Sequence, residues 1–133
     1  MTSGQATKEV IQTDHAPQAI GPYSQAIVAN GMVYTAGQIP IDPQTGQVAG
    51  SDIVVQAEQV MNNLSALLDA SGSSLSHVVK TTCFLANLDD FPAFNEVYGR
   101  SFPSAPPARS TVQVAKLPLG VLVEVECVAL VKG

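Results

Sequence analysis

The stretch VLVEVECVALV, residues 121–131, decides the fold class, because apolar residues occupy both alternating sets of positions. Successive side chains of a β-strand point to opposite faces of the sheet. One set is apolar throughout: Val121, Val123, Val125, Cys127, Ala129 and Val131. The other set places two carboxylates among large aliphatic side chains: Leu122, Glu124, Glu126, Val128 and Leu130. The sequence therefore predicts a strand whose two faces are both too apolar to be left in water.

The upstream sequence predicts a hairpin and a long helix. SQAIVAN (residues 24–30) and MVYTAGQ (residues 32–38) read as two strands joined at Asn30 and Gly31, a strong hairpin signal. Apolar residues then recur at helical spacing over residues 51–70, behind a Ser51 cap and before Gly72. HVVKTTCFLAN (residues 77–87) is rich in β-branched residues, which indicates a further strand.

A second, shorter helix is expected after Asp89 or Asp90, with Pro92 in its first turn and Phe91, Phe94 and Tyr98 on one side. A strand follows Pro106, and residues 8–12 add a possible first strand. The order ββαβαββ predicts an α+β fold, a mixed β-sheet with two helices packed on one face. Because two helices cover one face only, the mostly apolar open face indicates a partner subunit, and we expect a homo-oligomer.

Composition limits the functional classes. With 133 residues, 46% of them apolar, the chain suits one domain spanning residues 1–133, with a flexible tail at residues 1–6. Six basic and eleven acidic side chains give a net charge of −5, so we expect no nucleic-acid partner. Residues 1–17 contain no apolar run typical of a signal peptide or a membrane span, so we expect a cytoplasmic protein.

The sequence gives no sign of a metal site or cofactor. Cys83 and Cys127 lie in apolar strand-like runs without paired spacing, which is typical of buried, reduced thiols. His15 and His77 are isolated from other ligand types. We expect no cofactor.

The stretch PPARSTVQVAKLP, residues 106–118, raises the question of what Arg109 faces. Arg109, Thr111 and Gln113 share one face of the predicted strand. If Arg109 and Glu124 lie on neighbouring strands of the open face, subunit contact would half-bury both. They would then form either a structural ion pair or a site, in which the arginine fork binds a small carboxylate and a glutamate of raised pKa activates water.

Five motifs, in register over nearly the whole chain, resemble the RidA (YjgF/UK114) family of reactive-intermediate deaminases: GPYSQA (21–26), AGQIP (36–40), DDFPAFN (89–95), PPARSTVQVAKLP (106–118) and VEVECVAL (123–130). The resemblance implies a chorismate-mutase-like α+β fold and a homotrimer with active sites in clefts between subunits. It also implies hydrolysis of 2-enamino and 2-imino acids, released by pyridoxal-phosphate enzymes such as threonine dehydratase, to 2-oxo acids and ammonia.

The resemblance further implies roles for six residues. Arg109 would hold the substrate carboxylate, and Glu124 would position or activate the attacking water. The backbone of Thr111 would contact the imino nitrogen, and the backbone N–H of Gly37 would help to hold the water or the substrate. Two more residues would shape the pocket: Tyr23 and Asn95.

The chain departs from many family deaminases at two positions, with Thr111 in place of Cys and Ala36 in place of Ser. A backbone role at residue 111 tolerates threonine, whereas Ala36 removes a hydroxyl near the pocket. Other functions remain open: a non-catalytic module that binds or senses 2-oxo acids, a chaperone-like trimer, or a ribonuclease, which the acidic composition disfavours. Glu124 favours an enzyme over a sensor, because a second acid would repel a carboxylate ligand.

Overall fold

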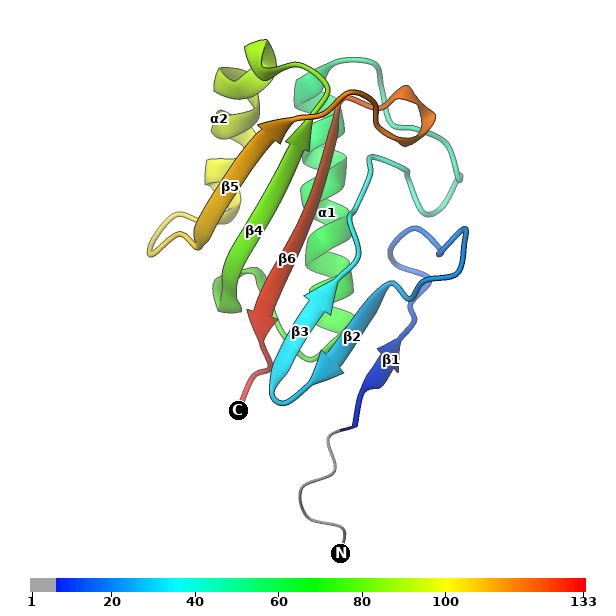
Figure 1. Ribbon diagram of the computed structural model, residues 1–133, viewed down its shortest axis with the longest axis vertical. Helices are drawn as coiled ribbons and strands as arrows, with labels where there is room; N and C mark the ends of the chain where they lie inside the picture. Colours follow the sequence, from blue (N-terminus) through cyan, green and yellow to red (C-terminus); the bar gives the residue numbers. More distant parts are fainter. Residues whose placement is uncertain (1–6) are drawn as a thin grey trace, which may run out of the picture.

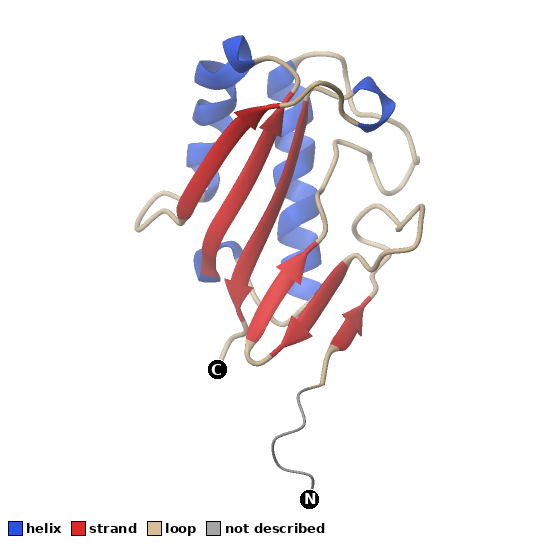
Figure 2. Ribbon diagram, in the orientation of Figure 1, coloured by secondary structure: helices blue, strands red, loops and turns tan. Residues whose placement is uncertain are grey.

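The computed structural model describes residues 7–133 and arranges them as one six-stranded sheet with two α-helices on one face (Figures 1 and 2). The helices are α1 (Ile53–Ala70) and α2 (Phe91–Ser101). The strands are β1 (Glu9–Ile11), β2 (Ala26–Ala29), β3 (Met32–Thr35), β4 (Val78–Leu85), β5 (Ala108–Gln113) and β6 (Val123–Leu130). The predicted α+β architecture is confirmed, while the tail predicted at residues 1–6 lies outside the described residues.

The strand order is β1-β2-β3-β6-β4-β5, and β4–β5 is the parallel pair, whereas the other neighbours are antiparallel. α2 connects β4 to β5 and lies behind them in Figure 1, as a crossover between parallel strands requires. β5 is an edge strand, and β4 lies between β5 and β6. Both of these positions determine where the predicted site residues lie.

Local signals in the sequence account for the hairpin and the helix ends. Asn30 and Gly31 have φ values of 51° and 76°, the left-handed pair that a tight two-residue hairpin requires. Asp52, and not the predicted Ser51, caps α1, because its side chain accepts a hydrogen bond of 2.9 Å from Val55 N. Gly72, at φ 76°, follows the end of this helix.

The alternation in β6 separates the core from the open face. Val123, Val125, Cys127 and Ala129 are at most 3% exposed and pack with α1 and α2 in one core cluster. The opposite face of the sheet looks away from the helices (Figure 2) and carries large apolar side chains that remain 43–60% exposed: Val10, Tyr34, Val112 and Leu130. The predicted apolar open face is therefore present.

Candidate active site

Three of the six predicted site residues meet in a pocket beside the open face. Tyr23, Gly37 and Glu124 line a cavity of about 380 Å³. The rest of its wall is apolar or small: Ile20, Ala36, Ile39 and Pro118. Glu124 therefore presents a carboxylate to a mostly apolar cavity, the kind of environment in which a carboxylate is a strong base.

The Glu124 carboxylate lies directly against the backbone of Gly37. A Cβ atom at residue 37 would lie 2.7 Å from Glu124 Cδ, so only glycine leaves room for the carboxylate there. The N–H groups on either side of Gly37 are used, since Ala36 donates to Gln25 O and Gln38 donates to Val125 O, each at 2.8 Å. Within residues 7–133 the Gly37 N–H has no partner, so it remains available to a ligand.

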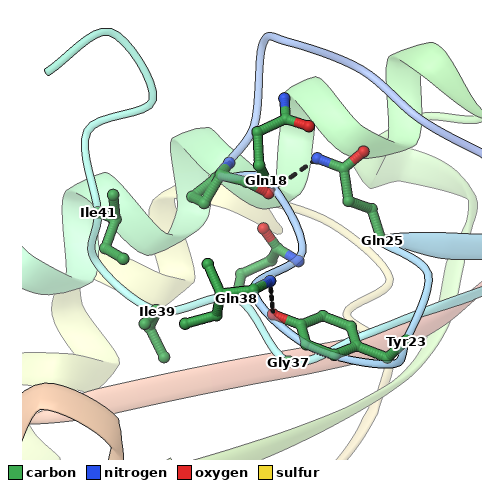
Figure 3. A pocket seen from close by; sticks show the side chains of 9 residues that line it. Gln18, Tyr23, Gln25, Gly37, Gln38, Ile39 and Ile41 are labelled. Carbon is green, nitrogen blue, oxygen red and sulfur yellow. Dashed lines mark hydrogen bonds between the residues drawn. The ribbon is translucent and has the colours of Figure 1, made fainter. Parts of the chain in front are cut away.

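Two hydrogen bonds hold the loop that carries Tyr23 (Figure 3). The Ile20 N–H donates to Tyr23 Oη at 3.3 Å, and Gln25 Nε2 donates to Pro17 O at 2.8 Å. Tyr23 and Gln38 also line a smaller cavity of about 30 Å³. The Oε1 atom of Gln38 is buried and has no hydrogen-bond partner among the described residues. A cavity of this size has room for a water molecule.

Burial raises the pKa of Glu124 above its ordinary value, and the negative charge of Glu126 adds to the effect. Glu126 lies two residues further along the same face of β6. A raised folded-state pKa means that the ionised carboxylate costs stability, increasingly as the pH rises through that pKa. A charge kept at such a cost is a typical sign of a functional group.

The other three predicted residues lie on the edge strand β5 and on α2 behind it. Arg109 Nη1, on β5, donates a hydrogen bond of 2.8 Å to Asn95 Oδ1 on α2. The side chain of Arg109 is half-buried, and no carboxylate of the described residues lies within ion-pair distance of it. A partly buried cation without a counter-ion suits an anionic ligand.

Thr111 presents its backbone to the free edge of the sheet. Val114 N donates to Leu85 O at 3.0 Å, so even-numbered residues of this segment point their backbone groups toward β4. The odd-numbered Thr111 therefore points its N–H and C=O groups outward, beside the Arg109 side chain. Its Oγ1 is buried and has no partner within the described part of the chain.

The condition considered above, that Arg109 and Glu124 lie on neighbouring strands of the open face, is not met within one chain. β4 lies between β5 and β6, and β5 is the edge strand. Through β4, Arg109 is in register with Thr81 and Cys127 on the helix face, whereas Glu124 is in register with Phe84 and Val112 on the open face. The two side chains of one chain therefore do not form an ion pair.

Two aromatic residues beside Arg109 were not among the predicted site residues. The Tyr98 and Phe91 rings both lie within cation–π range of its guanidinium. The spacing of Phe91, Asn95 and Tyr98 is i, i+4 and i+7, which puts all three on one face of α2. That spacing was visible in the sequence, but the parallel placement of β5 beside this face was not.

Solved structures share this fold of a six-stranded mixed sheet with two helices on one face. The crystal structure of E. coli TdcF with bound serine matches with a TM-score of 0.87 and 42% identity, covering 92% of this chain and 98% of that one.

The family model described as Endoribonuclease L-PSP matches residues 13–131, and the chain belongs to this family, which is the RidA (YjgF) family. Reactive Intermediate Deaminase A, chloroplastic, of Arabidopsis thaliana is 47% identical over 97% of this chain and 69% of that protein. The 2-iminobutanoate/2-iminopropanoate deaminase of Mus musculus is 44% identical over 92% of this chain and 90% of that protein.

Proposed function

We propose that this protein is an enzyme that hydrolyses 2-enamino and 2-imino acids to 2-oxo acids and ammonia. The observation that carries the proposal is the pair of complementary, unpaired groups. Arg109 is a cation without a carboxylate partner, and Glu124 is a carboxylate of raised pKa near which no cation lies within the described residues. A small 2-imino acid offers a carboxylate to the first and an electrophilic carbon to a water held by the second.

The proposed reaction needs positioning and proton transfer only. The Arg109 fork binds the substrate carboxylate, and Glu124 takes a proton from the attacking water as its oxygen bonds to the imino carbon. The C=N electron pair moves to nitrogen, which takes up the proton that Glu124 removed from the water, and a carbinolamine results. Transfer of the carbinolamine hydroxyl proton to nitrogen, through Glu124, lets the C–N bond break and ammonia leave as the C=O bond forms. In this proposal the Gly37 N–H contacts the water and the Thr111 backbone contacts the nitrogen. One imino acid and one water give one 2-oxo acid and one ammonia.

We also propose that two copies of the chain complete each site within a homotrimer, as the family resemblance implies. In one chain Arg109 and Glu124 lie on opposite faces, so a single copy does not bring both to one small substrate. The exposed apolar face supports an assembly, because a second copy would cover it.

Light scattering is expected to give the mass of a trimer at micromolar concentration. Replacing Val112, 43% exposed on the open face, by aspartate should shift the protein toward monomers and abolish imine hydrolysis together. An active monomer would contradict the proposed shared site.

The acid limb of the pH–rate profile should report Glu124. Because the base acts when ionised, kcat/KM should rise with pH through a pKa above the ordinary glutamate value. Glu126→Gln removes one of the two causes of the raised pKa, so the limb should move to lower pH with the plateau retained. Asp69→Asn, which removes an exposed charge on α1, serves as the control and should leave the limb in place.

The decisive assay measures 2-oxo acid release from imines generated in situ by an amino-acid oxidase or dehydratase, with and without this protein. Faster release at catalytic concentrations supports the enzyme. Binding of 2-oxobutyrate with no acceleration would instead support a 2-oxo acid sensor. The net charge of −5 remains an argument against an RNA substrate.

Neither helix within residues 7–133 has the length and apolar character needed to cross a bilayer. A cytoplasmic location stays a prediction, since the Arabidopsis relative is described as chloroplastic.

A further inference from the structure

Three consecutive turns of α2 hold the guanidinium of Arg109. Its Cζ lies 4.7 Å from the centroid of the Tyr98 ring and 5.2 Å from that of the Phe91 ring. Asn95, between them on the same helix face, accepts the hydrogen bond from Nη1. Both ring distances are within the range of about 6 Å at which a cation is attracted to an aromatic face.

Tyr98 is itself fixed by the core. It is 6% exposed, and its hydroxyl shares a buried hydrogen bond of 2.7 Å with Thr81 Oγ1 on β4. Its ring packs between Phe94 and Phe102, with centroid separations of 5.6 and 4.8 Å. Thr81 is also the register partner of Arg109 across the parallel β4–β5 pair. The same two strands thus set the positions of the arginine and of the ring that it contacts.

We propose that Tyr98, assisted by Phe91, is a positioning residue that orders the Arg109 guanidinium before the ligand arrives. This inference rests on the proposed role of Arg109 as the receptor for the substrate carboxylate. A long arginine side chain at a sheet edge would otherwise lose rotamer freedom on binding, and ordering it in advance lowers that cost. Because this residue acts through Arg109, its effect should fall on affinity.

The contacts of Arg109 with Tyr98, Phe91 and Asn95, called the clamp below, also restrict how a ligand approaches. Aromatic rings lie near the guanidinium, and one Nη1–H is committed to Asn95, whereas Nε and Nη2 have no hydrogen-bond partner within the described chain. A hollow of about 440 Å³ beside Arg109 is lined by Tyr98, Gly99, Phe102, Pro106 and Pro107. The free edge of the fork therefore matches a planar carboxylate, with which it makes two parallel bonds.

Calorimetry with 2-oxobutyrate tests the clamp. Tyr98→Leu removes the aromatic face and is expected to weaken binding about three- to thirtyfold, the equivalent of one cation–π contact. KM for imino acids should rise by a similar factor with little change in kcat, because Arg109 holds the carboxylate in both the ground state and the transition state. Tyr98→Phe keeps the ring and should bind within about twofold of the parent.

Val97→Ala is the matched control, because it changes a buried apolar residue of the same helix that is none of the aromatic side chains packed around Tyr98 and Arg109. It should lower the unfolding midpoint but keep the parental affinity. Should Tyr98→Leu fail to fold, Phe91→Leu, at the half-buried outer ring, tests the same contact and should weaken binding in the same direction.

Each outcome decides between the proposals. Parental affinity in a folded Tyr98→Leu variant, or equal weakening by Val97→Ala, would overturn the clamp and leave the proposed deaminase standing. A parent protein that binds 2-oxobutyrate but releases no 2-oxo acid from imines would overturn the deaminase and leave the clamp standing. A parent that binds no 2-oxo acid would overturn both.

Discussion

Glu124→Gln is expected to lower kcat for imino acids by about 10²- to 10⁴-fold, the usual contribution of a general base. Glutamine keeps the shape that fits against Gly37 but cannot take a proton from water. Affinity for 2-oxobutyrate should remain or improve slightly, because a negative charge near the ligand carboxylate is removed. Steady-state kinetics together with calorimetry on the same preparation measures both quantities.

Stability provides the control for this variant. Because the folded-state pKa of Glu124 is raised, its ionised form destabilises the fold at pH 7. This cost shrinks as the pH falls below the raised pKa and is absent below the ordinary glutamate pKa. Glu124→Gln should therefore leave the unfolding midpoint at pH 7 unchanged or raise it. A lost activity accompanied by a lower midpoint would point to structural damage, and unchanged turnover would move the role of base elsewhere, with Glu126 the nearest candidate.

Alternation and turn chemistry in the sequence were enough to predict the layers of this fold. The β6 pattern defined its two faces, and Asn30 and Gly31 located the hairpin, because both signals act between residues close in sequence. The error at the helix start was equally local: Ser51 and Asp52 are both good caps, and only the hydrogen bond to Val55 N distinguishes them.

The relation between Arg109 and Glu124 was not predictable in this way, because it depends on which strands are neighbours. Both residues were correctly placed on strands, and each face assignment within a strand followed from alternation. Strand order, however, is set by long-range packing. The crossover through α2 pairs β5 with β4 in parallel, and β5 lies at the edge of the sheet. Arg109 on β5 is therefore not next to Glu124 on β6. A strand–helix–strand unit at residues 77–113 is the signal from which that crossover could have been inferred.

The same geometry changes how the ion-pair interpretation of Arg109 should be judged. An ion pair with Glu124 inside one chain is excluded by the register, so a structural role for the arginine now requires the Asn95 and aromatic contacts alone. Those contacts leave Nε and Nη2 of the guanidinium without a hydrogen-bond partner among the described residues. Arg109→Lys separates the two remaining roles, because lysine keeps the positive charge but loses the planar fork.

Arg109→Lys is expected to reduce kcat/KM for imino acids about ten- to a hundredfold and to weaken 2-oxobutyrate binding, with the oligomeric mass unchanged. Lysine makes one directional bond where arginine makes two, and a hydrogen bond to a charged group is worth about 1.5–3 kcal/mol. At about 1.4 kcal/mol per factor of ten, that loss corresponds to the expected range. If the variant instead dissociates or unfolds more readily while its folded fraction hydrolyses imines at the parental rate, Arg109 is architectural, and the carboxylate site lies elsewhere.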